Sequence, residues 1–577
     1  MKIRIRDMNN QHIFRIFVIV LAISAATILP AQNQTETGQG HNEQVTIISS
    51  YDPSINQAFK INQSPTEMQF NLDKPEFSFE TIKIDQPTQI TLNPIVPVVI
   101  NADKRTYLTQ NSLKAGIGSL FSPYLDFFHS SGQKNDYRFD AHIHHLSSFK
   151  NIADYSPSPE SKTNLNLNYR KFLKYHIIDV GIYYSLKTNR YYGFKPDDFS
   201  AFTIDDSRLK QMYNLARVNM ALSSNYRNNK KLNHKINLDA YYYFDKYQTT
   251  EINANVDFDV HKSFEVSNLL NYQELGLSGK VNYFQNTDSI NSSDDVLVSL
   301  TPYFKANYGI LNFNIGLNFN FLNTDKTNFY FYPILDLNVN LIPKVLTVFA
   351  GLDGNVEKNS FLMLSELNPW VSSTIPITWD HTFKAYGGIR GNIAQKVNFS
   401  VQVSWQKFNN MFFFVNVPDA TTFNYLVAIP FNKFSTIHDK GSVFGVSGEL
   451  TFAASQKVNI MLGAVYNSYT LDSLDSPYHK PTSKIKFGAS FLTTKKLRIW
   501  TDIYYYGKRT ALDLSILPNT KIDLEAFIDL NVGVDYQLTD QFSVFLSLTN
   551  LLNQHYERYY NYPVQGIQIM GGIMYKF

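Results

Sequence analysis

The chain has 577 residues, with 18% charged residues, 15% aromatic residues and no cysteine. The lack of cysteine excludes a disulfide scaffold, a cysteine-ligated metal site and a thiol nucleophile. The formal charge of +3 resides in the first 31 residues, which contain four bases and one acid, so the rest of the chain is formally neutral and lacks the basic excess that nucleic-acid binding requires.

Residues 1–31 are predicted to be a secretory signal sequence. A basic start precedes an apolar stretch from Ile16 to Leu29, and Ala31 offers a small residue for cleavage. The apolar stretch is shorter than the roughly 20 residues that a membrane-spanning helix needs. Export is therefore favoured over an N-terminal membrane anchor.

Residues 32–112 are predicted to form an extended arm rather than a packed domain. Six prolines fall within residues 53–97, and proline both fixes the backbone and removes a hydrogen-bond donor. The arm either lies in the periplasm or inserts into the lumen of the domain that follows it.

Residues 113–577 are predicted to be an all-β, transmembrane antiparallel barrel. Residues 311–321 read Leu-Asn-Phe-Asn-Ile-Gly-Leu-Asn-Phe-Asn-Phe, so one face of this strand is apolar and the other polar. Similar runs of 10–15 residues recur along the chain, and this is the length of a tilted membrane strand. Lipid of an outer membrane is expected to cover the apolar face.

The polar positions of these runs are predicted to face the lumen. Two stretches show the alternation most clearly. The predicted lumen-lining residues are Arg138, Asp140, His142, His144, Asn312, Asn314, Asn318 and Asn320.

The barrel is predicted to have about 22 strands, with a range of 20 to 24. We count 21 strands by pattern, the first of them at residues 114–129. Single-chain bacterial barrels have even strand numbers, so either one assignment is wrong or the proline-containing segment 88–100 supplies another strand.

Short and long connections alternate along the chain. Because outer-membrane barrels have short periplasmic turns and long external loops, the long connections are predicted to face outward and Phe577 to end at the periplasm. The predicted long loops are 188–209, 357–380, 407–440, 471–483, 507–524 and 551–565.

Aromatic residues in these outer loops are candidate contacts for a ligand or partner. They are Tyr191, Tyr192, Phe194 and Trp370. The alternative is that they are exposed aromatics of the girdle at the membrane interface.

The sequence contains no catalytic motif, such as a zinc-protease pair, a nucleophile elbow, a phosphate-binding loop or a dinucleotide fingerprint. His142 and His144 share a strand face, but with no third ligand nearby a polar lumen pair is favoured over a metal site. No cofactor, metal or enzyme activity is predicted.

The C-terminus carries a motif of outer-membrane barrels. Gly572, Tyr575 and Phe577 match the glycine and aromatic positions of the insertion signal that the barrel-assembly machinery reads, although Met570 replaces the usual polar residue. Residues 542–566 resemble the end of TonB-dependent receptor barrels, in the variant typical of Bacteroidetes-type bacteria. Ile567 stands where that family has an arginine.

This resemblance implies a cell outer-membrane location in a Gram-negative bacterium and transport across that membrane. It also implies a globular plug about twice as large as the segment between residues 32 and 112. Residues 43–48 are faintly similar to the segment that pairs with TonB, although a solvated strand of the arm is favoured. The alternatives are an accessory subunit that holds a partner protein in the outer membrane or periplasm, and a passive porin.

Overall fold

The fold was obtained as a computed structural model. It describes residues 110–119, 121–132, 136–199, 206–226, 231–265, 269–394, 396–417, 433–455, 457–514 and 519–577. The predicted signal sequence, the segment 88–100 and nearly all of the predicted arm lie outside the described residues.

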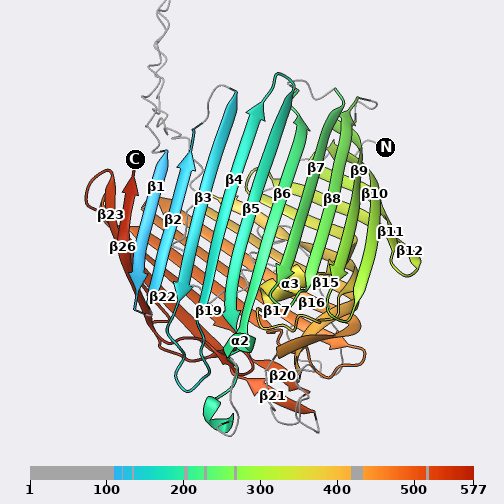
Figure 1. The fold of residues 1–577 in the computed structure, drawn as a ribbon. Helices are drawn as coiled ribbons and strands as arrows, with labels where there is room; N and C mark the ends of the chain where they lie inside the picture. The colour runs from blue at the N-terminus through green and yellow to red at the C-terminus, as the bar shows by residue number, and fades with distance from the viewer. Residues whose placement is uncertain are drawn as a thin grey trace, which may run out of the picture.

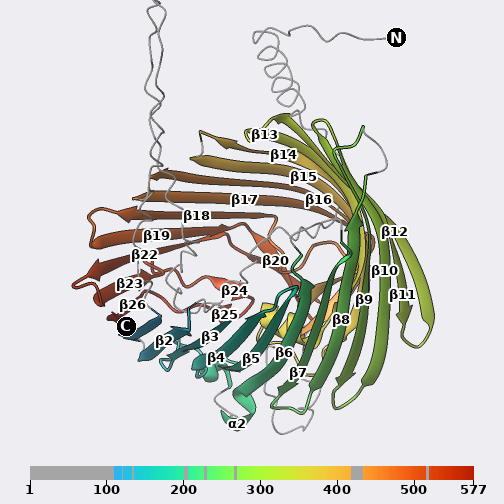
Figure 2. The ribbon, with the colours of Figure 1, turned by 90° about the horizontal axis from the view of Figure 1, so that it is seen from above.

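The described residues form a closed antiparallel barrel of 22 strands (Figures 1 and 2). Its strands are β1 (Asn111–Gly118), β2 (Ser122–Ser130), β3 (Tyr137–Ser148), β4 (Glu160–Phe172), β5 (His176–Arg190), β6 (Lys210–Ser224), β7 (Asn233–Asp245), β8 (Thr250–Ser263), β9 (Tyr272–Thr287), β10 (Ser292–Tyr308), β11 (Leu311–Asn323), β12 (Thr327–Ile342), β13 (Leu346–Asn359), β14 (Thr378–Ile393), β15 (Val397–Val417), β16 (Lys433–Ser455), β17 (Val458–Leu471), β18 (Ser483–Leu492), β19 (Leu497–Tyr506), β22 (Phe527–Gln537), β23 (Phe542–Thr549) and β26 (Gln568–Lys576).

The first and last strands close the barrel. β1 pairs with both β2 and β26, and in the seam Gly116 lies opposite Gly572. A Cβ atom on Gly572 would lie 2.1 Å from the carbonyl oxygen of Ala115. The glycine of the C-terminal motif is therefore required by the close approach of two backbones. The motif's aromatics stack beside it, with Tyr575 and Phe577 ring centroids 5.1 Å apart.

The predicted first strand, 114–129, is a hairpin of two strands. The chain reverses between Gly118 and Ser122, and Phe121 adopts a positive φ of 52°. This hairpin makes the strand number even, so the segment 88–100 is not needed for the count. The barrel begins at Asn111, two residues before the predicted boundary.

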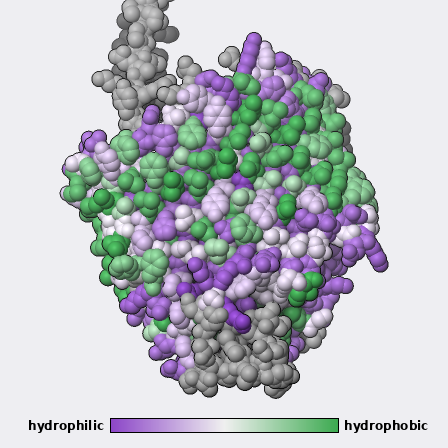
Figure 3. All heavy atoms as spheres, viewed as in Figure 1, coloured by the Kyte–Doolittle hydropathy of each residue, from purple (hydrophilic) through white to green (hydrophobic). Residues whose placement is uncertain are grey.

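Alternate side chains point to opposite sides of the wall. On β11, Ile315 and Leu317 are 50% and 43% exposed on the outside, whereas Asn318 and Asn320 are 8% and 0% exposed on the inside. Figure 3 shows a band of hydrophobic residues across the strands, with hydrophilic residues toward the end where the long loops lie. Such a band is the surface that a bilayer covers. No helix in the described residues is long and apolar enough to span a membrane.

Phe577 lies at one end of the barrel and the long loops lie at the other, at the bottom of Figure 1. Four short connections, β1–β2, β7–β8, β9–β10 and β11–β12, also lie at the long-loop end. The predicted bounds of one long loop, 407–440, were wrong. Residues 407–417 and 433–440 extend β15 and β16, which reach 21 and 23 residues, and residues 418–432 lie outside the described residues.

Small elements lie in the long loops and are not among the 22 strands of the wall. Two hairpins and three short helices are formed by β20 (Arg509–Asp513) with β21 (Thr520–Leu524), β24 (Glu557–Tyr559) with β25 (Tyr562–Pro563), η1 (Pro196–Phe199), α2 (Asp206–Leu209) and α3 (Phe361–Leu367). In Figure 2, α3, β20, β24 and β25 are seen within the ring of strands.

Candidate functional site

The inner wall carries two large polar cavities. A cavity of about 660 Å³ lies against β3 to β8 and includes Arg138 and Asp140. A second, of about 600 Å³, lies against β10 to β15 and includes Asn314 and Asn318. The structure therefore brings the two sets of predicted lumen residues to different parts of the wall. A smaller cavity of about 380 Å³ includes Asn312 and Asn314.

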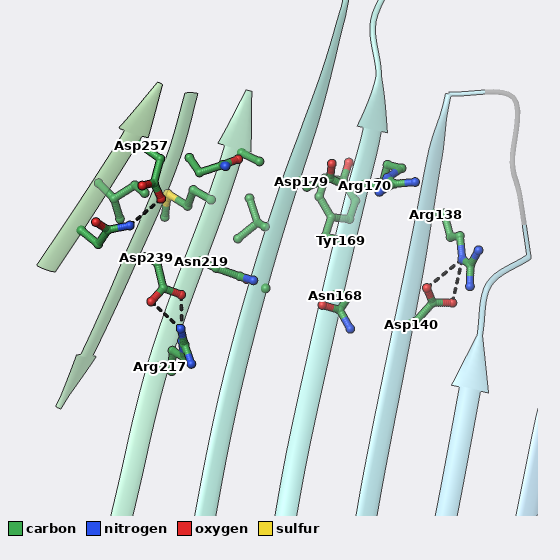
Figure 4. A pocket seen from close by; sticks show the side chains of 17 residues that line it. Arg138, Asp140, Asn168, Tyr169, Arg170, Asp179, Arg217, Asn219, Asp239 and Asp257 are labelled. Atoms are coloured by element: carbon green, nitrogen blue, oxygen red, sulfur yellow. Dashed lines mark hydrogen bonds and ion pairs between the residues drawn. The ribbon is translucent and has the colours of Figure 1, made fainter. Parts of the chain in front are cut away.

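Charges in the first cavity are paired within the wall. Figure 4 shows Arg217 and Asp239 on the neighbouring strands β6 and β7, and Arg138 and Asp140 on one strand, β3. Arg217 donates to both carboxylate oxygens of Asp239 at 2.7 Å, and Arg138 lies 2.7 Å from Asp140. These partly exposed pairs contribute little to stability. They leave a hydrated surface with almost no net charge of its own.

The remaining predicted lumen residues contact other polar groups. His142 and His144 both approach the same carboxylate oxygen of Asp126, at 2.9 and 3.2 Å. Asn320 accepts a hydrogen bond from Ser299 at 2.6 Å. Within the described residues, no group of three histidine or acidic side chains is arranged to hold a metal ion.

The segment 360–377, between β13 and β14, folds inward at the long-loop end. Ser360 accepts a hydrogen bond from the backbone N–H of Met363 at 3.1 Å and starts α3, as serine does at an N-cap. Asn368 and Pro369 end the helix, because the residue before a proline disfavours helical geometry. Phe361 and Leu364 are completely buried.

A buried carboxylate holds the start of this segment against the wall. Glu251 on β8 accepts hydrogen bonds from the backbone N–H groups of Phe361 and Leu362, at 2.6 and 3.3 Å. It also accepts from the hydroxyl of Tyr241 at 2.7 Å. Free N–H groups at a helix start attract negative charge, so Glu251 satisfies α3 from across the lumen.

Side chains of β5 and β6 and of loop residues directly next to β5 and β8 hold the rest of the segment. Their hydroxyl and amide groups donate to backbone carbonyl oxygens that no strand partner satisfies. The bonds are Asn189 to Pro369 (2.9 Å), Tyr213 to Pro369 (3.1 Å), Tyr191 to Val371 (3.0 Å) and Thr249 to Ser373 (2.8 Å). Ser373 and Gln211 both donate to Asp245.

The four aromatics identified as candidate loop contacts are buried. Tyr191, Tyr192, Phe194 and Trp370 are 0%, 8%, 5% and 3% exposed. Trp370 stacks on Tyr562 with ring centroids 4.2 Å apart. The alternative that they are exposed aromatics of the girdle is therefore wrong, because the loops that carry them turn into the barrel and pack on one another. A contact with a ligand or partner stays a prediction.

Burial also determines the chemistry of these tyrosines. It raises the pKa of both Tyr191 and Tyr192 well above the ordinary value, so their hydroxyl groups stay protonated and donate hydrogen bonds. Tyr192 donates to the carbonyl oxygen of Pro563 at 2.9 Å. Gly193 beside it is necessary because a Cβ there would lie 2.5 Å from the ring of Tyr562.

We use the term cap for the long-loop segments that meet across the barrel: 149–159, 191–199, 360–377, 472–482, 507–526 and 550–567, in their described parts. Hydrogen bonds join them in pairs. Tyr559 donates to Leu367 at 2.8 Å, and the backbone N–H of His479 donates to Thr510 at 2.8 Å. The cap thus connects loops that follow β13, β17, β19 and β23.

Sequence reasoning missed α3, Glu251 and the inward path of the cap. A local signal for α3 existed: Ser360 precedes Phe361, Leu364 and Leu367 at helical spacing, and Pro369 follows. No local signal marks Glu251, which lies 110 residues before its partner Phe361.

The sequence matches no protein-family model and no curated protein sequence. Solved structures, by contrast, match over most of the barrel. The pyoverdine receptor FpvA of Pseudomonas aeruginosa PAO1 has 14% identity, covers 82% of this chain and 79% of its own, and gives a TM-score of 0.61. The barrel has the fold of the TonB-dependent siderophore receptors.

Two further structures of this fold show the same similarity. The siderophore receptor PirA of Acinetobacter baumannii has 11% identity, with coverage of 82% and 81% and a TM-score of 0.60. The ferric-catecholate import receptor Fiu of E. coli K12 has 8% identity, with coverage of 82% of both chains and a TM-score of 0.60. At such identities the TonB-dependent receptor likeness concerns the fold.

Proposed function

We propose that this protein is a transport barrel of the Gram-negative outer membrane, closed at its outer mouth by its own cap. The observation that carries the proposal is the inward-folded segment 360–377, hydrogen-bonded to β5 to β8 at one end of a polar lumen. The names of the structural neighbours, which are siderophore and iron receptors, support the general role in transport. They do not supply a substrate for this chain.

The width of the barrel supports a conduit. Side chains can fill a barrel of about 8 strands, whereas barrels of 16 or more enclose a channel or a plugged lumen. Here the inner wall holds polar cavities below the cap. A solute of polar character can occupy such a lumen without losing its hydrogen bonds.

Transport then requires the cap segment to leave the lumen. The contacts that hold it are one β-bridge, between Val371 and Phe434, and hydrogen bonds from individual side chains, rather than a continuous ladder of strand pairs. Each such bond contributes about 0.5–1.5 kcal/mol net, and about 1.5–3 kcal/mol where a charged group takes part. A ligand that binds the open form better can therefore shift the equilibrium.

An accessory subunit of an outer-membrane complex is the second candidate. It is favoured by the aromatic packing of the cap, in which Tyr562 and Trp370 are almost completely buried with Phe434 of β16. These rings would have to separate before any solute passes. In this role the arm, residues 32–112, or the outer loops would hold a partner.

Planar-bilayer conductance of two proteins distinguishes the proposals. One protein is the unaltered chain. The other is a variant in which a short glycine–serine linker replaces residues 361–376. We expect low conductance for the unaltered barrel and high, stable conductance for the variant. Low conductance in both would refute closure by segment 360–377, and co-purification of a stoichiometric partner with the unaltered chain would then favour the accessory role.

A further inference from the structure

Four basic side chains gather within the cap and beside it, near the outer ends of β18 and β19. They come from the β17–β18 loop, β18, β20 and β24, and they are Lys480, Lys484, Arg509 and Arg558. Lys484 points inward, since its neighbour Ile485 is 43% exposed on the outer face. We call Lys480, Lys484 and Arg509 the basic cluster.

The basic cluster lacks the ion pairs that basic residues make elsewhere in this chain. Lys508 lies 2.9 Å from Glu525, and Lys521 lies 2.6 Å from Asp475. In the described part of the chain, Lys480, Lys484 and Arg509 form no salt bridge. Glu557 attracts Arg509, and Asp380 attracts Lys480, in both cases more weakly than in a salt bridge.

Arg509 is held firmly, but one of its donors is unused. Its two Nη atoms donate to the carbonyl oxygens of Arg558 and Glu557, at 2.5 and 2.8 Å. The residue is 6% exposed, and its Nε is buried without a hydrogen-bond partner. An unsatisfied buried donor of a charged group is destabilising, and a hydrogen bond to an anion would remove this cost.

Aromatic rings place the charges next to one another. Arg509 lies over the ring of Phe527 at 5.3 Å, and Lys484 lies over Tyr506 at 5.5 Å. Phe527 and Tyr506 are themselves stacked, with centroids 5.1 Å apart. Lys480 lies over Phe412 on β15 at 4.3 Å.

Burial and repulsion between like charges disfavour the protonated forms of these basic groups when no ligand is bound. Burial lowers the pKa of Lys480 to about 8, with a further contribution from the charge of Lys484. Burial also lowers the pKa of Arg509 to about 10, and Arg558 acts in the same direction. A negative charge between like charges reverses both effects.

We propose that Lys480, Lys484 and Arg509 form a binding site for an oxyanion, namely the carboxylate or phosphate group of a solute, where the cap meets β18. Ammonium and guanidinium N–H groups make their strongest hydrogen bonds with these oxyanions. The site lies against loops that also hold the cap together, through Arg509 and the carbonyl oxygens of β24 and its neighbours. Binding requires no transport step, so this inference stands apart from the proposed function.

Isothermal titration calorimetry of the full chain in detergent tests the site. The probes are inorganic phosphate, citrate and neutral glucose at constant ionic strength. We expect saturable binding of phosphate, citrate or both, and none of glucose. Phosphate binding alone would identify a phosphate site, and citrate binding alone a carboxylate site. Absence of binding by both anions would overturn the proposal.

The variant Lys480→Gln/Lys484→Gln is expected to weaken anion binding roughly tenfold or more, because charged hydrogen bonds are lost. Lys508→Gln is the matched control, since Lys508 neighbours Arg509 but is exposed and paired with Glu525, and it should bind as the unaltered chain does. Lys480→Gln alone, in a loop, replaces the double variant if that variant loses heat-modifiable gel mobility. Unchanged affinity in the folded lysine variants would refute the site.

Discussion

The wall and the cap are built by different physical means. Every strand of the wall is hydrogen-bonded to two neighbours, and β1 with β26 completes the ring. The segment 360–377 has a single β-bridge, between Val371 and Phe434, and otherwise depends on side chains such as Glu251. Breaking one strand contact in the wall opens the closed ring of hydrogen-bonded strands, whereas breaking one cap contact only loosens a loop. The following predictions use that difference, from the largest expected effect to the smallest.

Gly572→Ala should have the largest effect, because it acts on the seam of the wall. The added Cβ would lie 2.1 Å from a backbone oxygen of β1, so the first and last strands must separate. We expect loss of heat-modifiable gel mobility and of membrane insertion. Gly571→Ala is the matched control, since its Cβ would meet its neighbours at an ordinary 3.8 Å, and normal folding of Gly572→Ala would disprove the seam contact.

Glu251→Gln should open the cap while leaving the wall intact. A carboxamide keeps one accepting oxygen but adds an NH₂ group facing the N–H donors of α3, which weakens the closed form by about 1–3 kcal/mol. Single-channel recordings should show more frequent opening, with gel mobility unchanged. Glu449→Gln, an exposed carboxylate on β16, is the control. Equal opening frequencies in all three proteins would contradict the role of Glu251.

Deletion of residues 32–99 separates the arm from the cap as the means of closure. If the cap closes the barrel, conductance should stay low after the deletion, because Glu251 and its partners are unchanged. Combining the deletion with Glu251→Gln should restore frequent opening. High conductance from the deletion alone would instead assign closure to an arm that fills the lumen.

Acidic pH should weaken the cap slightly, through His479. Burial lowers the pKa of this histidine to about 3 from an ordinary 6.5, and its neutral form fits the contact of Nδ1 with the carbonyl oxygen of Phe414 at 2.9 Å. Because the open form takes up a proton more readily, closure should weaken as pH falls from 6.5 towards 3. As pH falls over this range, the frequency of channel opening should rise in the unaltered chain and stay constant in His479→Gln.

The same contrast explains what the sequence could predict. Alternation is local, so the residues 311–321 alone indicate an inward polar face and an outward apolar one, and the structure has that arrangement. The missing strand was hidden because the turn between β1 and β2 uses Phe121 at positive φ instead of the glycine or asparagine that usually marks it.

The cap could be predicted in part. Ser360 and Pro369 mark the ends of a short helix, but neither indicates that the helix enters the barrel. That path depends on partners far away in sequence, such as Tyr243, whose hydroxyl lies 2.6 Å from the Ser365 hydroxyl 122 residues later. The sequence therefore identifies Tyr191 and Trp370 as loop aromatics but gives no sign of their burial.

Labelling of a single cysteine tests most directly whether segment 360–377 lies inside the closed mouth. The chain has no cysteine, so Ser365→Cys introduces a unique thiol at a site that is 1% exposed, and Ser292→Cys provides an exposed reference on β10. With a membrane-impermeant maleimide added to intact cells, we expect Ser292→Cys to react fully and Ser365→Cys to remain unlabelled. The double variant Ser365→Cys/Glu251→Gln should become labelled. Rapid labelling of Ser365→Cys in the otherwise unaltered chain would contradict closure by the cap.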